Sequence, residues 1–158
     1  MSARKAYRPR PGSAVAGMNK LAMASPLRAP EIGAIALRVR AANAVVRAGQ
    51  ATEQNMADIA AAVNTAMVLC ERAGNNHEAL QIVFDAQDAL LRAQRHHAHA
   101  GRWCLDGPGI GEIAAALSLY EQLLGAITAL QLTAAIREAW KRAERGLVLE
   151  IREEAHAH

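Results

Sequence analysis

Apolar side chains recur through most of this chain at alternating steps of three and four residues, the spacing of one face of an α-helix. One such run follows Pro30 and ends at Gly49, and a second follows Thr52 and ends at Gly74. Proline fits the first turn of a helix, threonine caps helix starts, and glycine closes helix ends. The apolar positions of the two predicted helices are Ile32, Ile35, Val39, Ala42 and Val46, then Met56, Ile59, Val63, Ala66 and Cys70.

Two further runs show the same periodicity. Asn75 or Asn76 is a candidate cap for the third, which ends at Gly101, and the fourth follows a cap at Asp106 and can continue to Gly146. Four amphipathic helices with short connections predict an all-α fold, an antiparallel bundle of four main helices. The third stripe is Leu80, Val83, Gln87, Leu90, Gln94 and His97, and the fourth is Ile113, Leu117, Tyr120, Leu124 and Ile127.

The ends of the chain differ from this pattern. Residues 1–25 are rich in Pro, Gly, Ser and Arg without periodicity, so we expect a disordered basic tail followed by a single helical bundle domain over 26–158. Residues 1–30 hold six basic residues and no acidic one, whereas the remainder holds 12 basic and 15 acidic residues. A basic tail can bind phosphate backbones, but a solvated tail without a ligand is the simpler interpretation.

Composition narrows the class of protein. The chain has 158 residues, 52% of them hydrophobic, which is enough for one domain with its own core. It contains no apolar run of about 18 residues and no secretory signal pattern, and its two cysteines provide no disulfide framework. These features predict a cytoplasmic protein.

The stretch 94–112, QRHHAHAGRWCLDGPGIGE, concentrates metal-ligating residue types. His96 and His99 share one helical face, with His97 and Cys104 close by in sequence. Zinc can use such ligands, but the spacing matches no recognisable zinc pattern, and histidines also suit the negative end of a helix dipole. We therefore expect no metal and no cofactor here.

The same stretch holds three glycines, Gly107, Gly109 and Gly111, at the start of a predicted helix. Free N–H groups at such a start can hold a phosphate. A dinucleotide-binding loop requires a preceding strand, however, and here a helix precedes it. We interpret the segment as a tight corner in which Asp106 caps the helix and Pro108 sets its entry.

A small basic and aromatic patch is the third feature of this region. Arg92, Arg95, Arg102 and Trp103 together resemble a short nucleic-acid-binding surface. The surrounding domain is acidic and no helix-turn-helix is apparent, so this patch supports a nucleic-acid-binding regulator only as the alternative hypothesis.

The fourth run has a second apolar row beside its main stripe. With Leu119, Leu123 and Leu130 included, apolar residues cover about 160° of the helix, which is wider than a surface helix needs. This helix is therefore either an interface for a partner or a second copy, or the centre of the bundle, covered by the C-terminal segment with Trp140. No catalytic constellation stands out, and we expect no enzyme activity.

The segment RW, then Cys-Leu and DGPG over 102–109, followed by LSLYEQLL, resembles small Ala/Arg-rich helical proteins of phage and plasmid regions in proteobacteria. The resemblance implies a small non-enzymatic accessory protein that binds a partner encoded by the host or by the mobile element. The apolar-striped helices, the wide apolar arc of the fourth and the absence of a catalytic set favour an adaptor, inhibitor or regulator. A metal-dependent role for the histidine cluster ranks third, after nucleic-acid binding.

Overall fold

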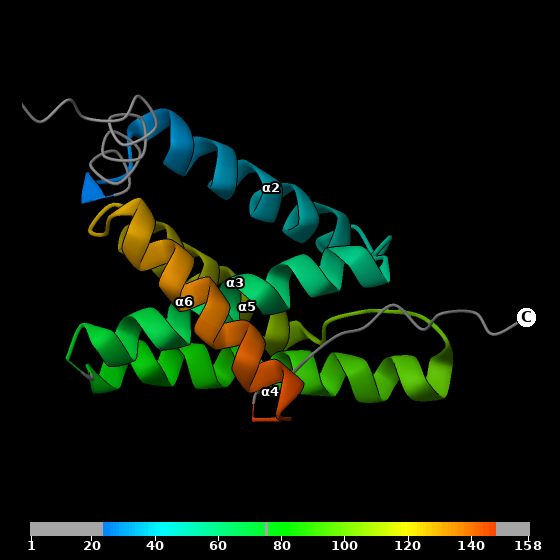
Figure 1. The fold of residues 1–158 in the computed structure, drawn as a ribbon. Helices are drawn as coiled ribbons and strands as arrows, with labels where there is room; N and C mark the ends of the chain where they lie inside the picture. Colours follow the sequence, from blue (N-terminus) through cyan, green and yellow to red (C-terminus); the bar gives the residue numbers. More distant parts are fainter. Residues whose placement is uncertain (1–23, 75, 148–158) are drawn as a thin grey trace, which may run out of the picture.

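The fold is all-helical (Figure 1). The computed structural model describes residues 24–74 and 76–147, and in these ranges it contains helices and no named strand. All of the predicted basic tail except Ala24 and Ser25 lies outside the described residues. The helices are α2 (Ala29–Arg47), α3 (Glu53–Arg72), α4 (His77–Ala100), α5 (Gly107–Leu124) and α6 (Ala129–Glu144).

The predicted helix caps are confirmed. The side chains of Thr52, Asn76 and Asp106 each accept a backbone hydrogen bond from the first turn of their helix. Gly49 and Gly101 follow helix ends with φ angles of 73° and 70°, a left-handed conformation that costs glycine little. Because these signals act within a few residues, the local sequence is sufficient to place them.

The fourth run of the sequence is two helices, so the prediction of four main helices is corrected to five in the described ranges. α5 ends at Leu124, and α6 begins after Thr128. The Thr128 hydroxyl accepts a hydrogen bond from the Gln131 N–H, and the Gln131 side chain accepts one from the Thr128 N–H. This reciprocal pair is a capping box, and it starts a new helix where the apolar spacing alone runs on.

The central helix is α3. It packs against α2, α4, α5 and α6. Every residue of α3 from 62 to 70 is buried, whereas α5 keeps exposed positions such as Ser118 and Gln122. Small side chains make this possible, because alanine and valine let neighbouring helices approach α3 from several sides. The centre of the bundle is thus not the helix with the widest apolar arc.

Helices α2 and α6 both pack on α3 and form a V (Figure 1). At the closed end, the Leu27 N–H donates to the Ile127 carbonyl over 3.1 Å, and Pro26 and Thr128 form an isolated antiparallel bridge. Beyond this link the two helices diverge, and α3 lies between them. Within the described ranges, no helix combines the length and the hydropathy that crossing a membrane requires.

Candidate functional site

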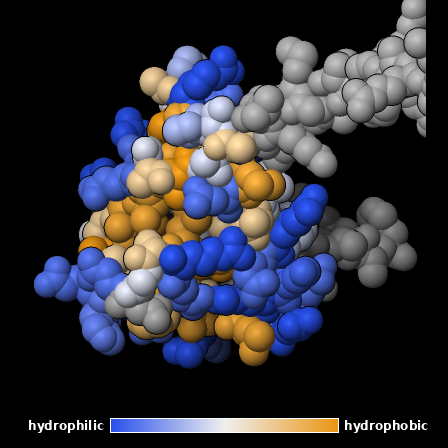
Figure 2. All heavy atoms as spheres, turned by 60° about the vertical axis from the view of Figure 1, so that its left-hand side comes forward, coloured by the Kyte–Doolittle hydropathy of each residue, from blue (hydrophilic) through white to orange (hydrophobic). Residues whose placement is uncertain are grey.

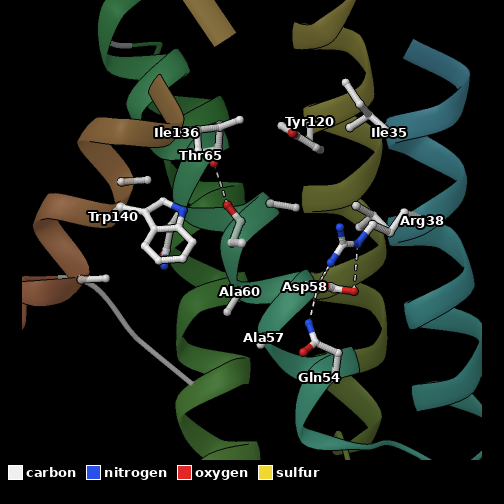
Figure 3. Close-up of a pocket in the computed structure, with 16 residues that line it drawn as sticks. Ile35, Arg38, Gln54, Ala57, Asp58, Ala60, Thr65, Tyr120, Ile136 and Trp140 are labelled. Atoms are coloured by element: carbon white, nitrogen blue, oxygen red, sulfur yellow. Dashed lines mark hydrogen bonds and ion pairs between the residues drawn. The ribbon is translucent and has the colours of Figure 1, made fainter. Parts of the chain in front are cut away.

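The space between α2 and α6 is a groove of about 620 Å³, and α3 forms its floor (Figure 3). Its volume lies within the range typical of ligand-binding clefts. We call it the α2–α6 groove. Its lining residues are Ile35, Arg38, Val39, Gln54, Ala57, Asp58, Ala60, Ala61, Ala62, Asn64, Thr65, Tyr120, Ile136, Ala139, Trp140 and Ala143.

The floor of the α2–α6 groove is made of small side chains. Ala57, Ala60 and Ala61 of α3 line it, and Ala61 is exposed. A methyl group leaves the backbone of α3 within reach of another segment, in the way that small residues allow helices to approach closely in membranes. The floor can therefore accept a helix or an extended chain without displacing large side chains.

The walls are apolar and only partly covered. On α6, Ile136 and Trp140 lie one turn apart, and they are 37% and 63% exposed. Ile35 and Val39 of α2 face them across the groove, one partly and one fully buried. Figure 3 shows the Trp140 indole directed from α6 over the floor. Exposed apolar patches and tryptophans are both enriched at interaction surfaces.

A charged cluster forms the rim on the α2 side. Arg38 makes a bidentate pair with Asp58, with Nη2–Oδ1 at 2.8 Å and Nε–Oδ2 at 3.2 Å, and Gln54 Nε2 donates to the same carboxylate over 2.9 Å. The Asp58 carboxylate lowers the free energy of the charged guanidinium, so the pKa of Arg38 is raised. The pair joins α2 to α3 and leaves this rim without net charge.

The polar groups deeper in the groove are already engaged or remain neutral. The Thr65 hydroxyl donates to the Ala61 carbonyl over 2.7 Å, and Asn64 Oδ1 accepts from Gln87 Nε2 over 3.0 Å. Burial disfavours the phenolate and raises the pKa of Tyr120 to about 12. At neutral pH the Tyr120 phenol is therefore protonated and is no general base.

The corner between α4 and α5 is held by Arg92. Its guanidinium contacts Asp106 over 2.7 and 3.2 Å and Glu112 over 2.6 Å. The Asp106 carboxylate also accepts the Gly109 N–H over 2.7 Å, and the hydrogen bond from Arg92, followed by that from Gly109, keeps its pKa below the usual range. The helix start is thus occupied by the chain's own carboxylate, as expected for a structural corner.

The four candidate metal ligands, His96, His97, His99 and Cys104, have different surroundings. His97 stacks on Trp103 with ring centroids 4.2 Å apart and an interplanar angle of 8°. His96 and Cys104 are half-buried, and His99 is exposed. In the described part of the chain, no group of three or more His, Cys, Asp or Glu side chains is arranged to hold a metal ion.

The residues predicted for nucleic-acid binding are brought near one corner, but they differ in availability. Arg95 and Arg102 are exposed, whereas Arg92 is engaged by Asp106 and Glu112. Trp103 is buried against His97, so its indole presents no open face for stacking on a base. Two exposed arginines remain of the predicted patch.

The predicted second apolar row is divided between two helices. Leu119 and Leu123 lie on α5, where they are half-buried and pack against the core, and Leu130 lies on α6 and is 55% exposed. The row is therefore not one face of a single helix. Figure 2 shows apolar atoms exposed among charged side chains on the face near the closed end of the V.

Sequence reasoning named no residue of the α2–α6 groove as a site. The sequence predicted Trp140 only as part of a segment that could cover the fourth helix, and it gave no role to Ile136, one turn away. A usable signal was present in REAWKRAER, residues 137–145, because its tryptophan is a large apolar residue among charged ones. The alanines of α3 carried no such signal, since alanine is common in every helix of this chain.

No protein-family model, curated protein or solved structure matches this chain.

Proposed function

We propose that this chain is a non-enzymatic interaction protein whose α2–α6 groove receives an acidic amphipathic helix of a protein partner. The observation that carries the proposal is Trp140, which is 63% exposed and stands beside Ile136 over a floor of alanines. A tryptophan in such a pocket is a typical interface hot spot, and covering it contributes on the order of 2 kcal/mol to binding. A role as an adaptor, inhibitor or regulator encoded by a mobile element is compatible with this site.

The shape of the groove favours a helix as the occupant. Two helical walls diverge over a floor of methyl groups, so a third helix can lie between them with its apolar face against α3. Ile136 and Trp140 are one turn apart, which matches the spacing of anchors on an amphipathic helix. A flat or broad partner surface would contact the rims but would leave the floor empty.

The charges around the groove favour an acidic partner. Arg137 and Lys141 are exposed on α6 and Arg145 follows its last residue; they lie beside the groove-lining positions rather than among them, and none makes an ion pair with another described residue. Glu144 is the exposed acidic residue next to them. On the opposite rim, the charge of Arg38 is matched by Asp58. The uncompensated charge is therefore mainly positive, and Glu-rich flanks on the entering helix would complement it and speed its association.

The test uses the full chain and a fluorescein-labelled amphipathic helix of about 18 residues with Leu at three- and four-residue spacing and Glu elsewhere. Binding is followed by fluorescence anisotropy, and the same peptide with Lys in place of Glu tests the charge preference. Ala61→Phe fills the floor, and Ala44→Phe adds the same side chain at an exposed position of α2 outside the groove lining.

We expect the acidic peptide to bind, the basic peptide to bind more weakly, and only Ala61→Phe to abolish binding. If Ala61→Phe and Ala44→Phe bound the acidic peptide equally well, the groove would not be the binding site. Binding of labelled single-stranded nucleic acid that survives Ala61→Phe, without any peptide binding, would instead favour the alternative of a nucleic-acid-binding regulator.

A further inference from the structure

We infer that the chain's own C-terminal segment, residues 148–158, occupies the α2–α6 groove in the free protein and competes with the partner helix. The inference rests on the proposed function in naming the competitor, but the contact itself is independent of any partner. Four observations carry it: the end of α6, the reach of the segment, its charge, and the apolar surface left open beside it.

The chain changes direction at the end of α6. The Gly146 N–H donates to the Ala143 carbonyl over 2.9 Å and the Leu147 N–H donates to the Arg142 carbonyl over 2.8 Å, with Gly146 at φ 68°. This pair of bonds is a Schellman motif, which ends a helix and redirects the chain that follows. The redirected chain starts one turn beyond Ala143, which itself lines the groove.

The segment is long enough to reach the whole groove. Eleven residues follow Leu147 and span up to about 36 Å when extended. The α6 wall from Ile136 to Ala143 rises only about 10 Å. A tether this short also gives the segment a high effective concentration at the groove, so weak intrinsic affinity is sufficient for substantial occupancy.

The composition of the segment matches the proposed ligand. It begins with an apolar block containing Val148, Leu149 and Ile151, and it carries three glutamates and one arginine. The net negative charge of this segment complements the exposed cations at the end of α6. The N-terminal residues 1–23 are excluded as the occupant because they carry five basic residues and no acidic one, and α6 would repel them. The three glutamates are Glu150, Glu153 and Glu154.

Apolar surface at the junction is open in the described structure. Leu147 is 68% exposed and Trp140 is 63% exposed, and both lie on the last part of the chain before the segment begins. In a Schellman motif the residue at the position of Leu147 commonly makes an apolar contact with the helix. An apolar block docked along Trp140 would cover both side chains together.

The experiment reads the environment of Trp140 directly. The chain has two tryptophans, and Trp103→Phe leaves Trp140 as the one reporter while keeping an aromatic ring against His97. In this background, Leu149→Asp with Ile151→Asp removes the apolar block. His156→Asp with His158→Asp is the matched control, because it adds the same two carboxylates to the same segment. Acrylamide quenching and the emission maximum are measured for all three proteins.

We expect the apolar-block variant to raise the quenching constant of Trp140 by about twofold and to shift its emission to longer wavelength, because the covered population is lost. The control should change neither quantity, and far-UV circular dichroism should show the same helicity throughout. Equal quenching in all three proteins would overturn the inference. Protection of Trp140 that disappears on dilution would also overturn it, because it would assign the occupant to a second copy.

The two proposals fail in different ways. The acidic peptide should bind the apolar-block variant about threefold more tightly than the unaltered chain, as expected if about one third of the molecules have an open groove. Peptide binding that is equal in both proteins, with unchanged Trp140 quenching, would remove the internal competitor and leave the proposed function. A changed Trp140 signal with no peptide binding to either protein would leave the internal contact and remove the proposed function.

Discussion

Gly109 offers the sharpest test of how the α4–α5 corner is built. A Cβ added at Gly109 would lie 2.6 Å from Asp106 Oδ1 and 3.3 Å from the Cβ of Ala89. The first distance is shorter than real contacts allow, so Asp106 must move. That movement breaks the 2.7 Å hydrogen bond from the Gly109 N–H and disturbs the pairing of Asp106 with Arg92. Gly111, two residues later on the same helix, has nothing within 4 Å of an added Cβ.

The expected changes have opposite signs. At Gly109, loss of the cap costs about 1 kcal/mol and crowding against Ala89 adds about 1 kcal/mol or more, so Gly109→Ala should lower the free energy of unfolding by about 2 kcal/mol. At Gly111, alanine gains helix propensity and restricts the unfolded chain, so Gly111→Ala should raise it by about 0.5–1 kcal/mol.

Urea unfolding followed by circular dichroism at 222 nm measures the free energy of unfolding of both variants, and thermal unfolding at the same wavelength measures their Tm. For a chain of this size, the Gly109 variant should lose about 4–8 °C in Tm and the Gly111 variant should gain about 1–4 °C. The pair controls for helix propensity, because the same substitution is made twice in one helix. If both variants were stabilised equally, the Asp106 cap would not be formed in solution, and the corner would be open to the anion-binding interpretation.

Other consequences can be measured on the same protein. Arg92 and the Gly109 N–H lower the pKa of the Asp106 carboxyl in the folded protein. Ionised Asp106 therefore stabilises the fold fully above the unfolded-state pKa of 3.8, and this stabilisation is lost as the pH falls through the lower folded-state pKa. Asp106→Asn should accordingly reduce the loss of unfolding free energy at acid pH. Cys70 is buried and its pKa is raised by burial, so an aromatic disulfide reagent should label Cys104 in the native state and Cys70 only after unfolding. Met56 is fully buried, and Met56→Ala should lower the free energy of unfolding by about 2–5 kcal/mol in urea titrations.

The parts of the fold that could be predicted are those that depend on neighbours in sequence. Thr52, Asn76 and Asp106 cap helices through atoms two or three residues away, and Gly49 and Gly101 need only their own backbone freedom. The break between α5 and α6 also has a local cause, the cap at Thr128. It was not predicted because the apolar spacing continues across it.

The centre of the bundle was harder to identify, because hydrophobic patterning weighs large side chains. α5 carries several leucines, yet α3 is buried on more sides through Ala62, Val63, Ala66 and their neighbours. Tertiary packing selects α3 because small residues permit close approach from four helices at once. A pattern of alanines identifies no single buried face, so the sequence could not rank α3 first.

The α2–α6 groove could not be predicted for a different reason. Ile35 and Trp140 lie more than one hundred residues apart, and neither is next to the other's helix in the chain. Their juxtaposition follows from the bridge of Pro26 to Thr128 and from the packing of both helices on α3. Each helix alone has an ordinary amphipathic pattern, and the hollow exists only because the two diverge.

The same construction indicates which wall of the groove can adjust to a ligand. α3 is held by packing on four sides and α4 is joined to α5 by Arg92, so the floor is rigid. α6 buries Leu132, Ala135 and Ala139 on α3 and has one ion pair to that helix, from Arg142 to Glu71. Elements with few buried apolar contacts open at lower free energy than the global fold. α6 is tied next to its start by the hydrogen bond from Leu27 to Ile127 and near its end by Arg142. α2 buries four side chains and makes ion pairs to both α3 and α5, whereas α6 buries three and pairs with α3 alone, so we expect α6 to be the wall that adjusts to an occupant.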